Sequence, residues 1–163
     1  MQSFLSCSII NHKPDVMKLI SLSFLLTLLI SCEQPQKISD KEVMDSFNQF
    51  FYMLDNDVDK IRDYLSEDFM IFEVGRKWNT EEFIEFVKGF GKFKSKRDFR
   101  NIKIDTDLNS AHISLEHSGE FQLEKPTPDG VTFLSYEWLE SAYFIKEKGK
   151  LKLKFYFSEQ IND

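Results

Sequence analysis

Alternation between apolar and polar side chains in the second half of the chain limits the fold more than any other feature. It is clearest between Ala111 and Leu123, where one face holds small and apolar residues together with His117 and the other holds polar residues. Alternation with a period of two is the pattern of a strand with one buried face. Three further strands are predicted between turn residues, at 99–106, 131–146 and 150–158. The second half is therefore predicted to form an antiparallel sheet.

Signals for three helices precede these strands. Ser39 followed by Glu42 is a capping-box pattern, in which the serine caps the first turn and the glutamate reaches back. Apolar residues then recur at helical spacing as far as about Asp55, and a short second helix is predicted at 58–65. A third helix is predicted to begin after the capping pattern at Asn79.

Between the second and third helices, the chain is predicted to form a strand at 68–74 that ends at Gly75 and returns through 76–78. A chain in which helices come first and long antiparallel strands come last has the layout of an α+β fold. The fold predicted from the sequence is α+β, with three N-terminal helices packed on a strongly curved, mostly antiparallel sheet. A basic cluster at 92–97 is predicted to be a solvated loop between the last helix and the sheet.

This order of elements resembles that of the nuclear transport factor 2-like superfamily, a cone-shaped fold that also houses SnoaL-like polyketide cyclases and ketosteroid isomerases. The resemblance covers residues 39–160, and the residues that carry it are 54–61, 65–69, 73–75 and 149–153. It implies a sheet that wraps a pocket, with acid or base side chains at the lip or floor of that pocket in the enzymes. Because one fold hosts many activities, the site must be argued from its own residues.

The first part of the chain carries its longest apolar run, at residues 19–30, directly after Lys18. These 12 residues are fewer than the roughly 20 needed to span a bilayer. A basic residue, a short apolar core and a small residue before a cut are typical of a secretory signal. The end of this signal resembles the lipobox of bacterial lipoproteins, in which the cysteine, here Cys32, is lipidated. The alternatives are an ordinary signal peptide that ends near a cysteine and a short buried helix.

The sequence thus predicts an exported protein that is lipid-anchored to a bacterial membrane through Cys32, in the cell envelope. Such a signal normally begins with a methionine and a basic residue, as at Met17 and Lys18. Residues 1–16 are therefore expected to be an over-extended start. The chain is divided into that start, a lipoprotein signal peptide, a tether and one nuclear transport factor 2-like domain: residues 1–16, 17–31, 32–38 and 39–160.

Charge and cysteine content exclude several classes of function. The chain has a net charge of −6, and removal of residues 1–31, which carry a net charge of +1, leaves about −7. Nucleic acid is not an expected partner, because phosphate binding needs a basic face. With Cys32 lipidated, no thiol remains for a disulfide, a nucleophile or a zinc cluster. The sequence also lacks a glycine-rich phosphate loop and an H-E-x-x-H motif, so we expect no cofactor and no metal site.

Two residues are candidates for acid–base chemistry. Glu73 falls about where the resemblance to ketosteroid isomerases implies their base carboxylate, and an apolar environment would raise its pKa. The catalytic tyrosine of those isomerases would fall near Gln49, and their second acid has no counterpart here. His117 lies on the apolar face of its strand. The alternatives are a surface acid at a strand end for Glu73 and a hydrogen-bonded core side chain for His117.

Candidate ligand-binding residues follow from the long strand at 131–146. Tyr136, Trp138 and Glu140 share one face of it, and Phe72 is grouped with them. Aromatic side chains with polar tips suit a flat or lipid-like ligand, although they pack cores equally well.

These patterns favour a non-enzymatic, membrane-anchored domain that binds a small apolar ligand or a protein partner in the cell envelope. The alternative is a SnoaL-like isomerase, cyclase or hydratase that uses Glu73 and His117 in the cone pocket. A third hypothesis is a homodimer formed through the open face of the sheet.

Overall fold

The computed structural model describes residues 36–161. In chain order these residues form two α-helices, one 3₁₀ helix and six strands: α2 (Asp40–Asn56), η1 (Val58–Tyr64), β1 (Leu65–Glu73), β2 (Arg76–Asn79), α3 (Thr80–Gly89), β3 (Phe93–Thr106), β4 (Ser110–Leu123), β5 (Phe133–Glu147) and β6 (Lys150–Gln160). The predicted α+β class and the predicted order of elements are confirmed.

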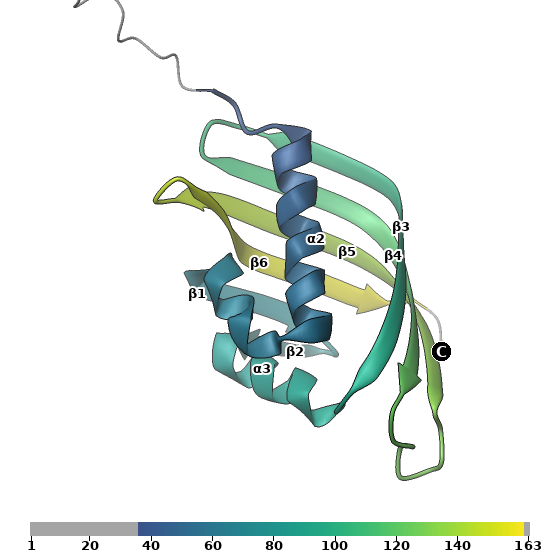
Figure 1. Cartoon of the computed structure of the whole chain (residues 1–163). Helices are drawn as coiled ribbons and strands as arrows, with labels where there is room; N and C mark the ends of the chain where they lie inside the picture. The colour runs from purple at the N-terminus through teal and green to yellow at the C-terminus, as the bar shows by residue number, and fades with distance from the viewer. Residues whose placement is uncertain (1–35, 162–163) are drawn as a thin grey trace, which may run out of the picture. The chain divides into compact units, whose positions relative to one another are not determined.

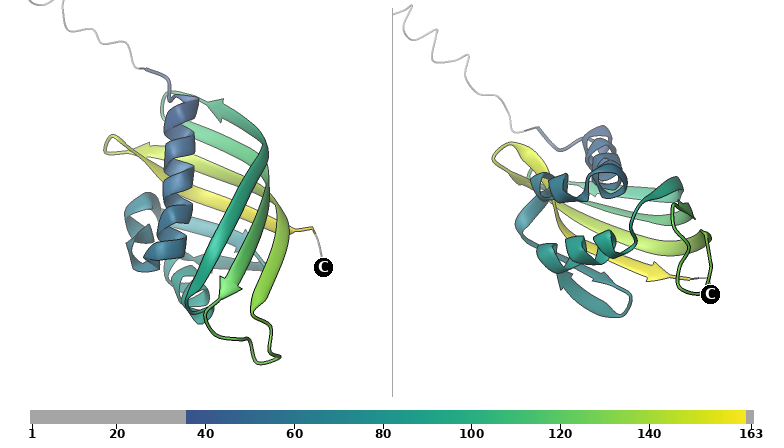
Figure 2. Two further views of the ribbon diagram at one scale, coloured as in Figure 1. Left: turned by 45° about the vertical axis from the view of Figure 1, so that its right-hand side comes forward. Right: turned by 60° about the horizontal axis from the view of Figure 1, so that its bottom comes forward.

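One six-stranded sheet organises the domain, with the strand order β2-β1-β6-β5-β4-β3. All neighbouring pairs are antiparallel except β1 and β6, which run parallel. The sheet curves strongly, and α2 runs across its concave face (Figure 1). The views in Figure 2 show η1 and α3 on the same side of the sheet, near the end that holds β1 and β2. The sheet and the three helices therefore enclose a common interior.

Helix α2 begins where its capping residue predicts. The side chain of Ser39 accepts a hydrogen bond from the backbone nitrogen of Glu42, while the Glu42 carboxylate lies 3.9 Å from the Lys146 ammonium of β5. One face of the helix packs on the sheet, where Phe47 meets the ring of Phe99 on β3 with 5.2 Å between centroids. Burial of this aromatic face holds α2 across the strands, since each such side chain contributes roughly 1.5–3 kcal/mol when fully buried.

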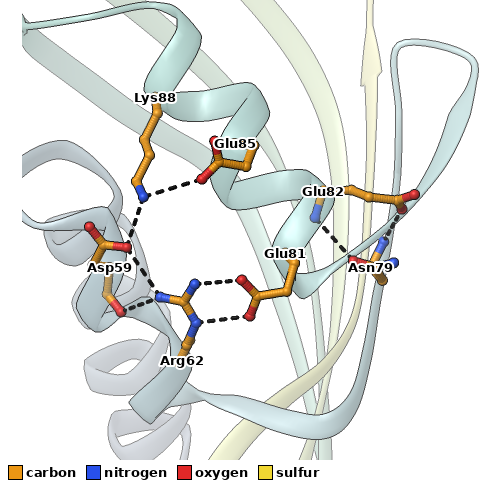
Figure 3. Close-up of polar contacts among 7 residues, drawn as sticks. All are labelled: Asp59, Arg62, Asn79, Glu81, Glu82, Glu85 and Lys88. Atoms are coloured by element: carbon orange, nitrogen blue, oxygen red, sulfur yellow. Dashed lines mark hydrogen bonds and ion pairs between the residues drawn. The ribbon is translucent and has the colours of Figure 1, made fainter.

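An exposed ionic network joins η1 to α3 (Figure 3). Arg62 of η1 donates to both carboxylate oxygens of Glu81, at 2.9 and 2.6 Å. Lys88 lies 3.0 Å from Asp59, which also contacts Arg62 at 3.2 Å. Helix α3 itself begins at a complete capping box formed by Asn79 and Glu82. Surface pairs of this kind are individually weak, but two of them, Arg62 with Glu81 and Asp59 with Lys88, connect η1 directly to α3.

Two predictions about strands are wrong. The segment 92–97 is not a solvated loop, because β3 begins at Phe93 and its residues 93–100 pair continuously with β4. Along β6, Leu151, Leu153, Phe155 and Phe157 alternate with polar residues in the sequence, which predicts that they share one face. Tyr143 pairs with Phe155 while the next residue, Phe144, pairs with Leu153, so Lys154 is an extra residue in the strand. Such a bulge moves the following side chains to the opposite face.

The turn between β1 and β2 has a strained backbone. It consists of Val74 and Gly75, with φ values of +53° and +66°. Positive φ at both positions suits a two-residue hairpin whose twist matches the strands, but it is an unusual conformation for a β-branched residue. The Val74 side chain is exposed and lies beside the interior cavity.

Candidate functional site

A cavity of about 520 Å³ opens between the concave face of the sheet and the helices. Its walls come from α2, α3, the β1–β2 turn and strands β3 to β6. Ten of the 23 lining residues are phenylalanine, tyrosine or tryptophan: Phe50, Phe51, Phe83, Phe86, Phe90, Phe93, Phe121, Tyr136, Trp138 and Tyr156. A cavity of this size and composition is typical of a site for a small organic molecule.

Gly119 leaves room for two of these rings. A Cβ atom at this position would lie 2.8 Å from the ring of Phe121 and 2.9 Å from the ring of Trp138. The two rings meet edge to face above the glycine, with 6.2 Å between their centroids. The absence of a side chain in the middle of β4 therefore sets the position of the aromatic wall.

A partly buried ion pair links α2 to the sheet beside the cavity. Arg97 on β3 donates to both carboxylate oxygens of Asp55 at 2.6 and 2.9 Å, and Ser95 donates to the same carboxylate at 2.5 Å. The guanidinium lies between the rings of Phe51 and Phe121, at 4.7 and 5.0 Å from their centroids. Arg97 is 11% exposed and Asp55 is 16% exposed. This arrangement holds the arginine firmly in place.

The network continues to His117 and Glu140. Arg97 Nη1 lies 3.4 Å from His117 Nε2, and His117 Nδ1 lies 2.8 Å from Glu140 Oε1. Because a guanidinium can only donate, Nε2 accepts from it, and Nδ1 carries the proton that is donated to Glu140. Both ring nitrogens are thus occupied, and the His117 side chain is 2% exposed.

Two polar atoms at the end of this network have no hydrogen-bond partner among the described residues. They are Oε2 of Glu140 and the hydroxyl oxygen of Tyr156. Burial, the charge of Glu140 and the interaction between the Tyr156 and Glu140 side chains raise the pKa of Tyr156 well above its usual value, so the phenol stays protonated beside this carboxylate. Buried polar atoms are nearly always paired in proteins, and this pair marks the part of the cavity wall where polar groups are least satisfied.

Glu73 stands at the end of β1, immediately before the strained turn. Its side chain lines the cavity, and the Trp78 indole donates to its backbone oxygen at 3.1 Å. The pKa of Glu73 is raised from 4.5 to about 7, mainly by burial and in addition by the charge of Glu140, while the charge of Arg97 opposes the rise. The carboxyl group therefore changes its protonation state near neutral pH, as a proton-transferring or ligand-sensing group would.

The structure brings five of the predicted site residues to one cavity. Glu73, His117, Tyr136, Trp138 and Glu140 all line it, although they come from three different strands.

Phe72 requires a correction, because it lies on the other face of β1. Successive side chains of a strand point to opposite faces, so Phe72 and Glu73 cannot both face the cavity. Phe72 is 39% exposed on the outer face of the sheet, where its ring meets that of Phe155 with 5.2 Å between centroids.

Sequence reasoning missed Asp55, Arg97 and Tyr156. A signal for Arg97 was present, since lysines at 92, 94 and 96 alternate with Phe93, Ser95 and Arg97. This alternation is typical of a strand with its lysines outward. Asp55 had no comparable signal, because its role depends on a partner 42 residues away.

The predicted lipidation site, Cys32, and the signal peptide before it lie outside the described residues. Among residues 36–161, no helix is both long and apolar enough to cross a membrane. No group of three or more histidine, cysteine or acidic side chains in the same region is arranged to hold a metal ion.

Comparison with known proteins identifies the fold. No family model matches the sequence, and neither does any curated protein. A putative calcium/calmodulin-dependent protein kinase II association domain from Xanthomonas campestris is similar over 77% of this chain and 90% of its own, with 14% identity and a TM-score of 0.65. An NTF2-like protein from Cytophaga hutchinsonii is similar over 76% of this chain and 100% of its own, with 15% identity and a TM-score of 0.62.

A putative scytalone dehydratase from Novosphingobium aromaticivorans is also similar, over 75% of this chain and 83% of its own, with 15% identity and a TM-score of 0.60. The chain therefore has the nuclear transport factor 2-like fold, as its sequence resemblance predicted. Identities this low establish the fold alone.

Proposed function

We propose that this protein binds a small apolar or amphipathic molecule in its cavity while a lipid on Cys32 holds it at a membrane of the cell envelope. The observation that carries the binding proposal is the cavity of about 520 Å³, in whose wall ten of the 23 residues are phenylalanine, tyrosine or tryptophan. Aromatic walls with a few polar groups provide both the apolar surface and the orientation that such a ligand needs.

Binding is better supported than proton transfer. An acid–base mechanism that uses both Glu73 and His117 needs a histidine nitrogen that can reach the substrate. Arg97 and Glu140 occupy the two nitrogens of His117. Glu73 is then the one acid–base candidate of the original pair that remains available, and a lone carboxyl group near neutral pKa equally serves recognition.

A neutral aromatic probe tests the binding proposal. We expect 2-(1-naphthyl)ethanol to bind the full chain in lipid nanodiscs, and Leu134→Trp to weaken it at least about fivefold, or about 1 kcal/mol, because the indole fills part of the cavity. Ser135→Trp is the matched control, since Ser135 is the exposed neighbour of Leu134 on β5. Isothermal titration calorimetry measures all three affinities. No binding by the unmodified chain, or equal binding by Leu134→Trp, would contradict the proposal.

The anchor is proposed from the signal-like run at 19–30 and from the lipobox-like residues that end at Cys32. We expect cells that express the protein to incorporate labelled palmitate into it, and Cys32→Ala to abolish the incorporation. Cys7→Ala is the control and should label normally, since Cys7 precedes the apolar run. Labelling that persists in Cys32→Ala would refute the anchor, and membrane fractionation of the same cells gives an independent measure.

We also propose that two copies associate through the outer face of the sheet. Apolar side chains gather there over β1, β6 and β5: Phe72, Phe155, Phe157, Leu139 and Tyr143. Phe157 pairs with Phe72 on one side and with Ser141 on the other, between Leu139 and Tyr143. A contiguous exposed apolar patch is typical of an interaction surface. Several similar structures are named association domains or hubs.

Light scattering tests this association on a chain that begins at Glu33, which retains the complete sheet and its core. We expect a dimer, and we expect Phe157→Lys to be monomeric because it places a charge in the middle of the patch. Ser118→Lys is the control, since Ser118 lies on the outer face of β4 among polar residues. A monomeric unmodified chain would rule out the dimer.

A further inference from the structure

Carboxylates dominate the charged groups around the cavity. Glu73 and Glu140 lie in its wall, and Glu159 lies at the exposed end of β6. Arg97 is the single lysine or arginine among the described residues that line it. The cavity therefore carries an excess of negative charge unless Arg97 offsets it.

Arg97 is not available to bind an anionic ligand. Its guanidinium is held by both oxygens of Asp55 at 2.6 and 2.9 Å, and its remaining Nη1 faces His117. Phenylalanine rings cover both sides of it. A ligand carboxylate would have to displace Asp55 from a buried bidentate pair, which is the strongest kind of charge-assisted hydrogen bond.

Glu140 adds an unsatisfied acceptor to the same wall. Its side chain is 3% exposed, one carboxylate oxygen binds His117, and the other has no hydrogen-bond partner among residues 36–161. The negative potential at this end of the cavity is thus left for a ligand to compensate.

The aromatic wall also favours a ligand with a positive charge. Tyr136 and Trp138 lie 5.5 Å apart between ring centroids, and Phe121 meets both of them. Faces of aromatic rings attract cations, with tryptophan the strongest, and the effect grows when water is excluded.

We propose that the cavity selects an amphipathic organic cation, a molecule with a flat apolar body and a protonated amine, over an anion of the same shape. This inference rests on the proposed ligand-binding function and names the class of the ligand. Glu73, at the strained lip of the cavity, is the carboxylate that meets the ammonium group. Glu140 lies deeper and supplies the negative potential that draws the cation inward.

The inference includes a dependence on pH, because the empty cavity holds Glu73 with a pKa of about 7. The other titratable and charged groups that line the cavity are Arg97 on β3, His117 on β4, Glu140 on β5, and Tyr156 and Glu159 on β6. A cation favours the ionised form of Glu73. Its affinity should therefore rise about tenfold between pH 6 and pH 8, following the ionised fraction of a group with that pKa.

Three probes with one skeleton test the inference on the full chain in lipid nanodiscs. They are 2-(1-naphthyl)ethylamine, 2-(1-naphthyl)ethanol and 1-naphthaleneacetate, which are cationic, neutral and anionic at pH 7.5. Calorimetric titration against empty nanodiscs corrects for partition into lipid. Glu73→Gln removes the proposed partner, and Glu67→Gln, an exposed carboxylate on the same strand, is the matched control.

We expect the amine to bind about tenfold more tightly than the alcohol and the acetate to bind most weakly. Glu73→Gln should remove most of the advantage of the amine over the alcohol and abolish the pH dependence, while Glu67→Gln changes neither. If the alcohol binds but the acetate matches the amine, or if Glu73→Gln leaves the preference for the amine intact, the inference is overturned and the proposed function survives. If none of the three probes binds, both are overturned.

Discussion

Replacing Asp55 by alanine is expected to lower the free energy of unfolding by about 3 kcal/mol, the lower end of the usual cost of breaking a buried ion pair from one side, because its pair with Arg97 is partly buried. The variant leaves the Arg97 guanidinium between two aromatic rings with His117 as its remaining polar contact. It also leaves the Ser95 hydroxyl without its acceptor. Urea denaturation of the chain that begins at Glu33, followed by circular dichroism, measures the change.

The position of Asp55 in α2 means that local helix effects cannot explain a loss of stability. Asp55 lies in the last turn of α2, where a negative charge is unfavourable to the helix dipole and alanine has the higher helix propensity. Local effects would therefore stabilise the variant, so any large loss comes from the buried pair. The double variant Asp55→Leu/Arg97→Met should recover most of the loss, because it leaves no unpaired charge. A loss below about 1 kcal/mol in Asp55→Ala, as typical of surface pairs, would show that the pair is not buried in solution.

A matched surface pair provides the control. Lys41 and Asp45 are four residues apart on the same helix, with side chains 82% and 63% exposed. Asp45→Ala should have little effect on stability because solvent already screens that pair. Comparison of the two aspartates separates burial from the general effect of removing an acid from α2.

The fold was predictable wherever the sequence pattern reports on local structure. The alternation along β4 correctly placed His117 and Gly119 on the buried face, because an unbroken strand keeps its phase. The capping box at Asn79 correctly marked the start of α3. These signals depend on neighbours within a few residues, so the rest of the fold does not alter them.

Prediction failed where the phase of a strand changes or where partners are distant in sequence. The bulge at Lys154 turns Tyr156 toward the cavity and Phe157 toward the outer face, and no residue type in β6 announces it. Phe72 was assigned to the cavity together with Glu73, although adjacent residues of a strand point to opposite faces and only one of them can line the cavity. The pairing of Asp55 with Arg97 depends on how α2 crosses the sheet, which is a tertiary property.

Replacing Glu73 by glutamine is expected to stabilise the empty protein at pH 8, by up to about 3 kcal/mol, and to leave its stability unchanged below pH 4.5. The pKa of Glu73 rises from 4.5 in the unfolded chain to about 7 in the folded one, and each pKa unit corresponds to about 1.4 kcal/mol. Because the folded state binds the proton more tightly, the stability of the unmodified chain falls as the pH rises between these two values. Glutamine carries no charge at any pH, so the variant escapes this loss.

Urea denaturation at pH 4.5, 6, 7 and 8 measures the difference between the two chains, which cancels the titration of all other groups. Glu67→Gln should show no pH-dependent difference, since Glu67 is exposed. A difference between Glu73→Gln and the unmodified chain that stays constant with pH would mean that the folded protein does not perturb Glu73.

A carboxylate that destabilises the empty fold at neutral pH is expected where a ligand relieves it, because stability is commonly sacrificed at functional sites. Glu73 combines a strained neighbour at Val74 with a desolvated charge at the lip of the cavity. A cationic ligand that meets this charge should therefore raise the free energy of unfolding more at pH 8 than at pH 6. In Glu73→Gln, the same ligand should give an equal and smaller increase at both pH values. Measurements of stability and of binding thus test one property of Glu73: its carboxylate is unfavourable in the empty cavity and favourable beside a cation.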